Sequence, residues 1–205
     1  MTSGSAERTA LEELLGGRRG LLDTAVPPVV FVSVNTAVGF RPALLAALGA
    51  GAALLLVRLV RRERLRNALG GFFLVAIAVG FAAYTGEARD YFLPGILMNI
   101  GWLVLCVVSV AVGRPILGVV LARLEGHGAD WHQDERVRRL FALATLIWAG
   151  AFATRILVQG SLYLADRPGW LAVARLVTGW PLFLATLPPT IALIRRARAV
   201  PATQG

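Results

Sequence analysis

The sequence contains no lysine, a single cysteine and few carboxylates. All 21 basic residues of the 205-residue chain are therefore arginines, against 12 Asp and Glu. Charged residues make up 16% of the chain, whereas about 25% is usual in a soluble domain. This scarcity excludes a disordered chain, a coiled coil and almost any water-soluble enzyme of this length. The lone thiol, Cys106, excludes an intrachain disulfide.

Catalytic motifs are also lacking. The chain has no GxSxG, no Walker-type glycine loop and no HExxH. Its two histidines lie in a polar loop whose ligand-type residues have no recognised zinc spacing. These loop residues are His127, Asp130, His132, Asp134 and Glu135. We therefore expect no enzymatic activity and no catalytic, cofactor-binding or metal-binding residues.

Long apolar segments dominate what is present. Hydrophobic residues make up 57% of the chain, and its mean hydropathy is +0.67. A transmembrane helix needs about 17–25 predominantly apolar residues. The pattern predicts an all-α, polytopic bundle of six transmembrane helices, within a membrane domain at 21–196 and between tails at 1–20 and 197–205. The six predicted spans are 24–39, 42–60, 67–84, 95–112, 140–163 and 170–194.

Prolines and one short apolar stretch refine this plan. Pro27 and Pro28 are expected to open the first span, and Pro42 suits the first turn of the second. Prolines 181, 188 and 189 fall inside the sixth span and predict a kink there. The stretch at 113–124 follows a charge and a proline and is too short to cross. We expect it to form an interfacial helix on the cytoplasmic side.

The arginines give the orientation. They concentrate in four segments that alternate with three poor ones, in which only Arg41, Arg89 and Arg167 occur. Cationic loops resist translocation, so the arginine-rich side is predicted to be cytoplasmic. Both termini are therefore expected on the cytoplasmic side of the plasma membrane. Anionic lipids at that face are the expected partner. Because the arginines are divided among four segments that flank the membrane and do not form one folded basic face, nucleic-acid binding is not expected. The rich segments carry arginines 8, 18 and 19; 58, 61, 62, 64 and 66; 114, 123, 136, 138 and 139; and 195, 196 and 198.

Polar side chains inside the spans are the candidate functional residues, because they are costly in lipid and usually face the bundle interior. Arg155 and Gln159 share one face of span five, in a stripe with Trp148, Phe152 and Tyr163. The predicted topology places four polar side chains about 6–12 Å below the outer boundary of the membrane: Asn35, Asn99, Arg155 and Arg175. The predicted cluster comprises Asn35, Asn99, Arg155, Gln159 and Arg175.

Three interpretations of this cluster compete. The first is a structural clamp in which the arginines bond polar groups and backbone carbonyls across helices. The second is an outward-facing cavity where Arg155 and Arg175 bind an anion, with Glu87 and Asp166 as the nearest counter-ions. The third is snorkelling of both arginines to outer phosphates. We rank them in that order.

A set of short motifs distributed along the chain carries a resemblance to a known family. These motifs include Pro28 to Phe31, Leu56 to Glu63, Gly86-Glu87, Tyr91 to Leu93, Arg114 to Ile116, Arg155, Gln159, Gly169 to Leu171, Arg175 and Gly179 to Leu182. On these residues, the chain resembles a family of actinobacterial membrane proteins catalogued as domain of unknown function 3159. The resemblance covers about Leu15 to Arg198 and implies no activity. A more distant similarity, of pattern only, is to septation-protein-A-like membrane proteins.

The function that follows is a multi-pass inner-membrane protein with an accessory or structural role in the cell envelope. The alternative is a small transporter or channel with a polar cavity lined by Arg155 and Arg175. A three-plus-three inverted repeat would favour transport. A membrane-embedded enzyme ranks lower, because the spans contain no carboxylate or histidine. Glycine-rich faces leave room for a homo-oligomer.

Overall fold

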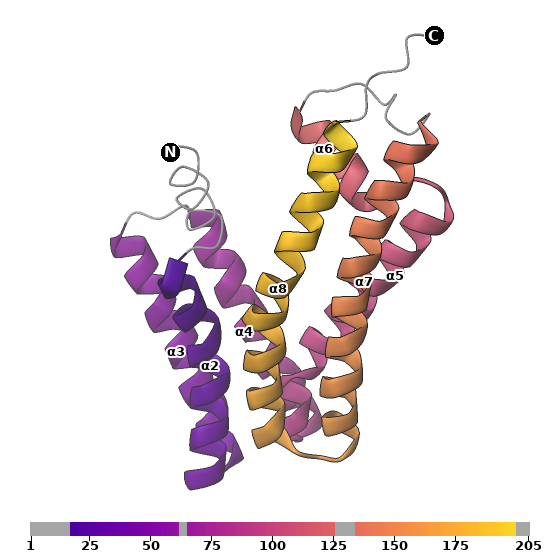
Figure 1. Cartoon of the computed structure of the whole chain (residues 1–205). Coiled ribbons are helices and arrows are strands. Elements are labelled where there is room, and N and C mark those ends of the chain that lie inside the picture. The colour runs from indigo at the N-terminus through magenta and orange to yellow at the C-terminus, as the bar shows by residue number, and fades with distance from the viewer. Residues whose placement is uncertain (1–16, 62–64, 126–133, 200–205) are drawn as a thin grey trace. The chain divides into compact units, whose positions relative to one another are not determined.

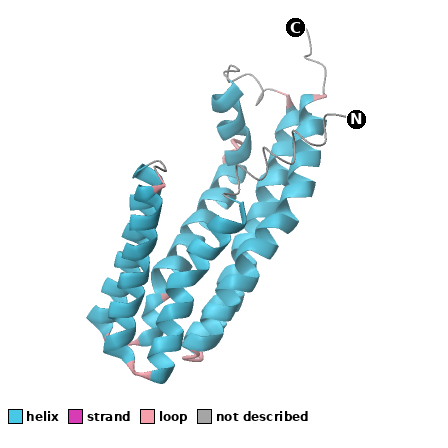
Figure 2. Ribbon diagram, turned by 90° about the vertical axis from the view of Figure 1, so that its left-hand side faces the viewer, coloured by secondary structure: helices cyan, strands magenta, loops and turns pink. Residues whose placement is uncertain are grey.

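The protein is all-α. A computed structural model describes residues 17–61, 65–125 and 134–199, which contain α-helices, one 3-10 turn and short loops but no strand (Figures 1 and 2). The elements are α2 Gly17–Ala37, α3 Phe40–Val60, α4 Leu65–Thr85, η1 Ala88–Tyr91, α5 Leu93–Ala111, α6 Ile116–Glu125, α7 Glu135–Leu164 and α8 Pro168–Arg198. Each predicted span overlaps one long helix, and α6 occupies the stretch predicted to be interfacial.

Four of the long helices are both long and apolar enough to cross a membrane, namely α3, α5, α7 and α8. The apolar parts of α2 and α4 are shorter, at Ala25–Ala37 and Leu69–Thr85. Both helices begin in charged sequence, with Arg18 and Arg19 in α2 and Arg66 in α4. The fold is therefore that of a helical membrane protein with four clear candidate spans, against the six that we predicted.

Glycines with positive φ separate consecutive helices. Gly39 (φ 109°) divides α2 from α3, and Gly113 (φ 74°) follows α5. Such backbone angles strain any residue with a Cβ atom, so glycine ends a helix at low cost. The start of α7 depends instead on Asp134, whose Oδ1 accepts hydrogen bonds from the backbone N–H groups of Arg136 (2.8 Å) and Val137 (3.2 Å). This cap places the first turn of α7 before the apolar sequence begins.

Prolines lie within two helices without interrupting them. Pro27 and Pro28, which we expected to open the first helix, lie in the middle of α2 and are buried. Helix α8 likewise continues through Pro181, Pro188 and Pro189. Each proline removes one backbone donor, and neighbouring helices can compensate for that loss in a membrane protein.

The chain divides into two compact units. The first comprises Met1–Pro94 with Asp166–Val173, and the second comprises Gly95–Ala165 with Ala174–Gly205. In the first unit, α3 packs against both α2 and α4, and η1 packs against α4. Gly51 lies at a close contact between α3 and α4, because a Cβ atom there would lie 3.2 Å from Cγ1 of Val75.

The core of the first unit is aromatic. Phe31 of α2 is fully buried and stacks on Tyr91 of η1, with ring centroids 4.3 Å apart and an interplanar angle of 8°. Phe92 and Phe40 each meet Phe31 edge to face, at 6.5 Å. The short connection between α4 and α5 is thereby anchored on α2 and the start of α3.

Candidate functional site

Arg155 lies on α7, and its guanidinium group forms hydrogen bonds with the backbone of α8. Its Nε donates a hydrogen bond of 2.7 Å to the carbonyl oxygen of Thr178, and its NH2 donates one of 2.7 Å to that of Gly179. The guanidinium carbon also lies 6.0 Å from the ring centroid of Phe152, one turn earlier on α7. The side chain is half-buried. Arg155 therefore joins two helices through fixed backbone acceptors.

The carbonyl oxygens of Thr178 and Gly179 accept these bonds although both residues lie inside α8. Each carbonyl oxygen has two lone pairs, so it can accept a bond from its own helix and a second one from Arg155. Pro181 does not free these two oxygens, because the carbonyl that its missing N–H would have served is that of Val177, four residues earlier.

Gln159 extends the contact by one turn along α7. Its Nε2 donates to Oγ1 of Thr178 at 3.1 Å, and that hydroxyl in turn donates to the carbonyl of Ala174 at 2.6 Å. Both Gln159 and Thr178 are buried. Two of the predicted site residues, Arg155 and Gln159, therefore meet at the same point of α8.

Arg175 and Asn99 lie beside the first turn of α5. Asn99 donates from Nδ2 to the carbonyl of Gly95 at 2.7 Å. A Cβ atom added to Gly95 would lie 3.4 Å from NH1 of Arg175, so the guanidinium packs directly over this glycine. Four of the five predicted residues therefore lie in the second unit, on α5, α7 and α8. The fifth, Asn35, lies half-buried on α2 in the first unit.

Further contacts continue along α7 and α8 beyond the predicted residues. Trp148 donates from Nε1 to Oγ1 of Thr190 at 3.1 Å, and Thr190 donates to the carbonyl of Thr186 at 2.7 Å. The ring of Trp148 meets Phe183 edge to face at 5.2 Å. Together with the contacts of Arg155 and Gln159, this defines a polar seam between the two helices: Trp148, Arg155, Gln159, Thr178, Gly179 and Thr190.

The polarity of this seam limits its chemistry. The hydroxyls of Thr178 and Thr190 donate to carbonyls of their own helix, so they offer only lone pairs to α7. Gln159 and Trp148 supply the matching donors. Arg155 is the exception, since two of its five N–H groups bond α8 and the others form no hydrogen bond with the described residues. The seam can hold helices together, and Arg155 retains donors that could meet an anion.

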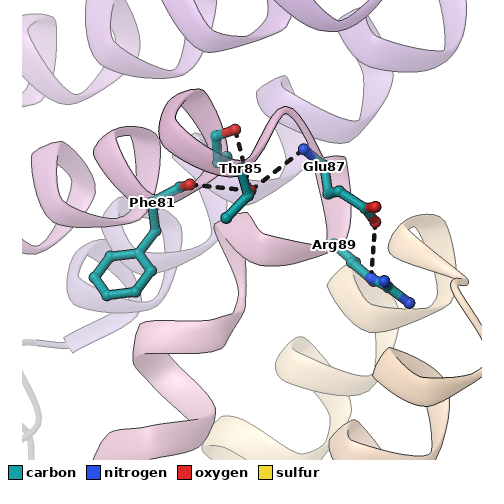
Figure 3. A network of polar contacts seen from close by, with 5 residues as sticks. Phe81, Thr85, Glu87 and Arg89 are labelled. Carbon is teal, nitrogen blue, oxygen red and sulfur yellow. Dashed lines mark hydrogen bonds and ion pairs between the residues drawn. The ribbon is translucent and has the colours of Figure 1, made fainter.

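A second polar network lies in the first unit, at the end of α4 (Figure 3). The hydroxyl of Thr85 donates to the carbonyl of Phe81 at 3.1 Å and accepts from the backbone N–H of Glu87 at 3.3 Å. The carboxylate of Glu87 lies 3.0 Å from Nε of Arg89. Glu87, considered above as a counter-ion for the intramembrane arginines, is therefore paired within its own loop.

The polar loop before α7 is only partly described. His127, Asp130 and His132 lie outside the described residues. At the edge of this loop, Asp134 caps α7 and Glu135 pairs with Arg139 at 2.6 Å. Among the residues that the structure describes, no three His, Cys, Asp or Glu side chains gather as a metal site would require.

Thr178 and Thr190 are the seam residues that sequence reasoning missed. Threonines are common in transmembrane helices and usually bond their own backbone, so their presence alone predicts nothing. No signal in the sequence marked their side of the seam, because the carbonyls that accept from Arg155 are present in every residue.

Comparison with known proteins places most of the chain in one family. A family model described as "Protein of unknown function (DUF3159)" matches residues 15–201. No curated protein and no solved structure matches the chain.

Proposed function

The chain belongs to the family described as "Protein of unknown function (DUF3159)", and we propose that it is a multi-pass protein of the plasma membrane with a structural or accessory role in the cell envelope. We propose no catalytic activity for it. The proposal rests on the two hydrogen bonds that Arg155 donates to the carbonyl oxygens of Thr178 and Gly179. The intramembrane charge best suited to a ligand site serves helix packing instead.

Six crossings remain our proposal for the topology. Helices α2 and α4 each have 21 residues, about 31 Å at 1.5 Å per residue, which matches the hydrocarbon thickness. Their charged first turns suit the headgroup region, where arginine side chains snorkel towards water. Both helices pack on α3, whose length and hydropathy suffice for a span. An even number of crossings puts both arginine-rich termini in the cytoplasm.

A direct test compares stability and solute flux in the same variants. Arg155→Ala removes both bonds to α8, and we expect a loss of about 1–3 kcal/mol of unfolding free energy, because a charge-assisted bond is stronger than a neutral one. The measurement is thermal unfolding of the purified protein in detergent. Thr154→Ala is the matched control, since Thr154 is exposed and its hydroxyl bonds only the carbonyl of Gly150 in its own helix.

The flux arm uses proteoliposomes that contain wild type or Arg155→Gln. A structural role predicts no flux of small anions or cations through either protein. A measured flux in wild type that disappears in a stably folded Arg155→Gln protein would overturn the proposal. An unchanged melting temperature in Arg155→Ala would also contradict it.

The alternative is a small transporter or channel, and two observations favour it. Arg155 retains N–H groups beyond the two that bond α8. In addition, the first unit contains α2, α3 and α4 and the second contains α5, α7 and most of α8. With three spans in each unit, the first and fourth spans would enter the membrane from opposite sides, as in inverted-repeat transporters. The flux arm separates this function from the structural one.

A further inference from the structure

One end of the second unit gathers arginines from three separate helices. Helices α7 and α8 are antiparallel, because Trp148 contacts Thr190 whereas Arg155, later in α7, contacts the earlier Thr178. The first turn of α7 therefore lies at the same end as the last turn of α8. Arginines 136, 138 and 139 start α7, and arginines 195, 196 and 198 end α8.

Helix α6 is fixed at this same end. Gly113, with φ 74°, turns the chain after α5, and the hydroxyl of Ser109 accepts a hydrogen bond of 3.1 Å from the backbone N–H of Ile116. Pro115 is fully buried at the bend. From there α6 packs against α7 (Figure 1). This bend and helix add Arg114 and Arg123, both exposed.

Two carboxylates at the start of α7 already have partners. Asp134 accepts two backbone hydrogen bonds as the cap of α7, and Glu135 pairs with Arg139 at 2.6 Å. Three exposed arginines, one from each helix, form no ion pair with the side chains that the structure describes: Arg123, Arg136 and Arg196. Arginines therefore predominate at this end of the unit, and the carboxylates of Asp134 and Glu135 are committed to local roles.

We propose that this basic end, defined by Arg123, Arg136 and Arg196 together with their neighbouring arginines, binds the phosphate of an anionic phospholipid. The inference rests on the proposed membrane topology and names a partner for one defined part of it. A guanidinium presents paired N–H groups that match phosphate oxygens, which makes arginine well suited to such headgroups. Contributions from three helices would let one lipid tie α6, α7 and α8 together.

The apolar surroundings favour a lipid over a soluble phosphate. Val112, at the end of α5, and Val120, on α6, are exposed. Helix α6 has only ten residues, too few to cross a bilayer, yet its sequence is mostly apolar apart from its last turns. Apolar side chains beside arginines are typical of a helix at the headgroup boundary. Acyl chains would cover the valines while the phosphate meets the arginines.

The test measures how the full chain, purified in detergent, responds to added lipid. Dioleoyl phosphatidylglycerol should raise the melting temperature more than dioleoyl phosphatidylcholine does, because a ligand that binds only the folded state stabilises it. Native mass spectrometry should show retained phosphatidylglycerol. In Arg123→Gln/Arg136→Gln/Arg196→Gln, we expect roughly a 10–100-fold weaker apparent affinity for phosphatidylglycerol. Arg→Lys at the same positions preserves charge and should lose much less.

The matched control removes three exposed arginines from the first unit: Arg41→Gln/Arg61→Gln/Arg167→Gln. It should retain phosphatidylglycerol as wild type does. Equal losses in the two triple variants would overturn the site, since attraction would then follow net charge alone. Equal stabilisation by glycerol 3-phosphate would overturn the lipid as ligand. If the triple variant does not fold, Arg196→Gln alone must weaken binding by more than Arg167→Gln does.

These outcomes are separable from failure of the proposed function. The structural role of Arg155 is measured in phosphatidylcholine alone, where the basic end has no anionic ligand. A protein whose stability depends on Arg155 but does not discriminate between the two lipids would refute only the lipid site.

Discussion

At the scale of single residues, the contact between Trp148 and Thr190 offers a measurable side-chain bond between α7 and α8. Trp148→Phe retains an aromatic ring against Phe183 but removes the N–H that Thr190 accepts. Thr190→Val removes the acceptor with little change in volume. Hydrogen bonds between transmembrane helices contribute about 0.6 kcal/mol on average and up to about 1.7. We expect a coupling energy within that range from unfolding of both single variants and the double variant.

The coupling energy distinguishes the bond from packing alone. Because a double-variant cycle removes the separate effects of ring and methyl packing, additive losses would show that the hydrogen bond contributes nothing. Circular dichroism is the appropriate measurement, since Trp148→Phe itself changes the intrinsic fluorescence.

Phe31 provides a residue-scale prediction for the first unit. Its ring is fully buried among Phe40, Tyr91 and Phe92. Phe31→Ala should destabilise the protein by about 3–5 kcal/mol, the usual loss for a buried phenylalanine. Phe81→Ala is the control, because the ring of Phe81 is 41% exposed. Thermal unfolding in detergent should show a much larger loss for Phe31→Ala, and similar losses in the two variants would contradict the aromatic core.

Sequence reasoning located one side of the polar seam and not the other. Arg155 and Gln159 were identifiable because polar groups are rare in apolar spans and lie four residues apart on a helix. Their partners on α8 are a threonine hydroxyl and two backbone carbonyls. Every residue has a carbonyl, so sequence alone cannot show which one accepts a bond. That choice depends on how α7 and α8 pack.

At the scale of elements, the packing of α3 on α4 depends on Gly51. A Cβ atom there would already lie 3.2 Å from Val75 and 3.5 Å from Phe72, so a larger side chain must separate the helices. Gly51→Leu should cost about 1–3 kcal/mol through overpacking. Gly49→Leu makes the same change on the same helix, where no atom lies within 4 Å of the added Cβ. Comparable melting temperatures for the two variants would refute the close contact.

The helices themselves followed from hydropathy, whereas several of their ends did not. Helix α7 begins at Glu135, five residues before the predicted span, because Asp134 satisfies the first backbone donors in polar sequence. Helix α2 begins at Gly17 and continues through Pro27 and Pro28. Hydropathy detects where a helix meets apolar surroundings, but caps and tertiary contacts determine where its hydrogen bonding starts.

At the scale of the whole molecule, the number of membrane crossings determines on which side of the membrane each arginine-rich segment lies. Four helices qualify as spans by length and hydropathy alone. If α2 and α4 cross as well, every arginine-rich segment falls on one side of the membrane. If α4 does not cross, the segment with arginines 58, 61, 62, 64 and 66 falls on the side opposite the end of α8. The location of a few loop residues therefore decides the topology.

Cysteine labelling can make that decision, because Cys106 is the only native thiol and Cys106→Ala gives a cysteine-free background. Single cysteines at Val38→Cys, Ala165→Cys and Ala199→Cys report the ends of α2, α7 and α8, and Ser5→Cys reports the N-terminal tail. A membrane-impermeant maleimide applied to intact cells should label the first two positions. It should label positions 5 and 199 only after the membrane is permeabilised.

Each alternative gives a different pattern from this expected result. If α4 does not cross, position 38 is labelled together with position 199 instead of position 165. If α2 does not cross, position 5 is labelled together with position 38. Labelling of positions 5 and 199, but of neither position 38 nor position 165, in intact cells would show the reversed orientation. The arginine-rich ends would then face outward, which the cost of translocating so many cations makes the least favourable arrangement.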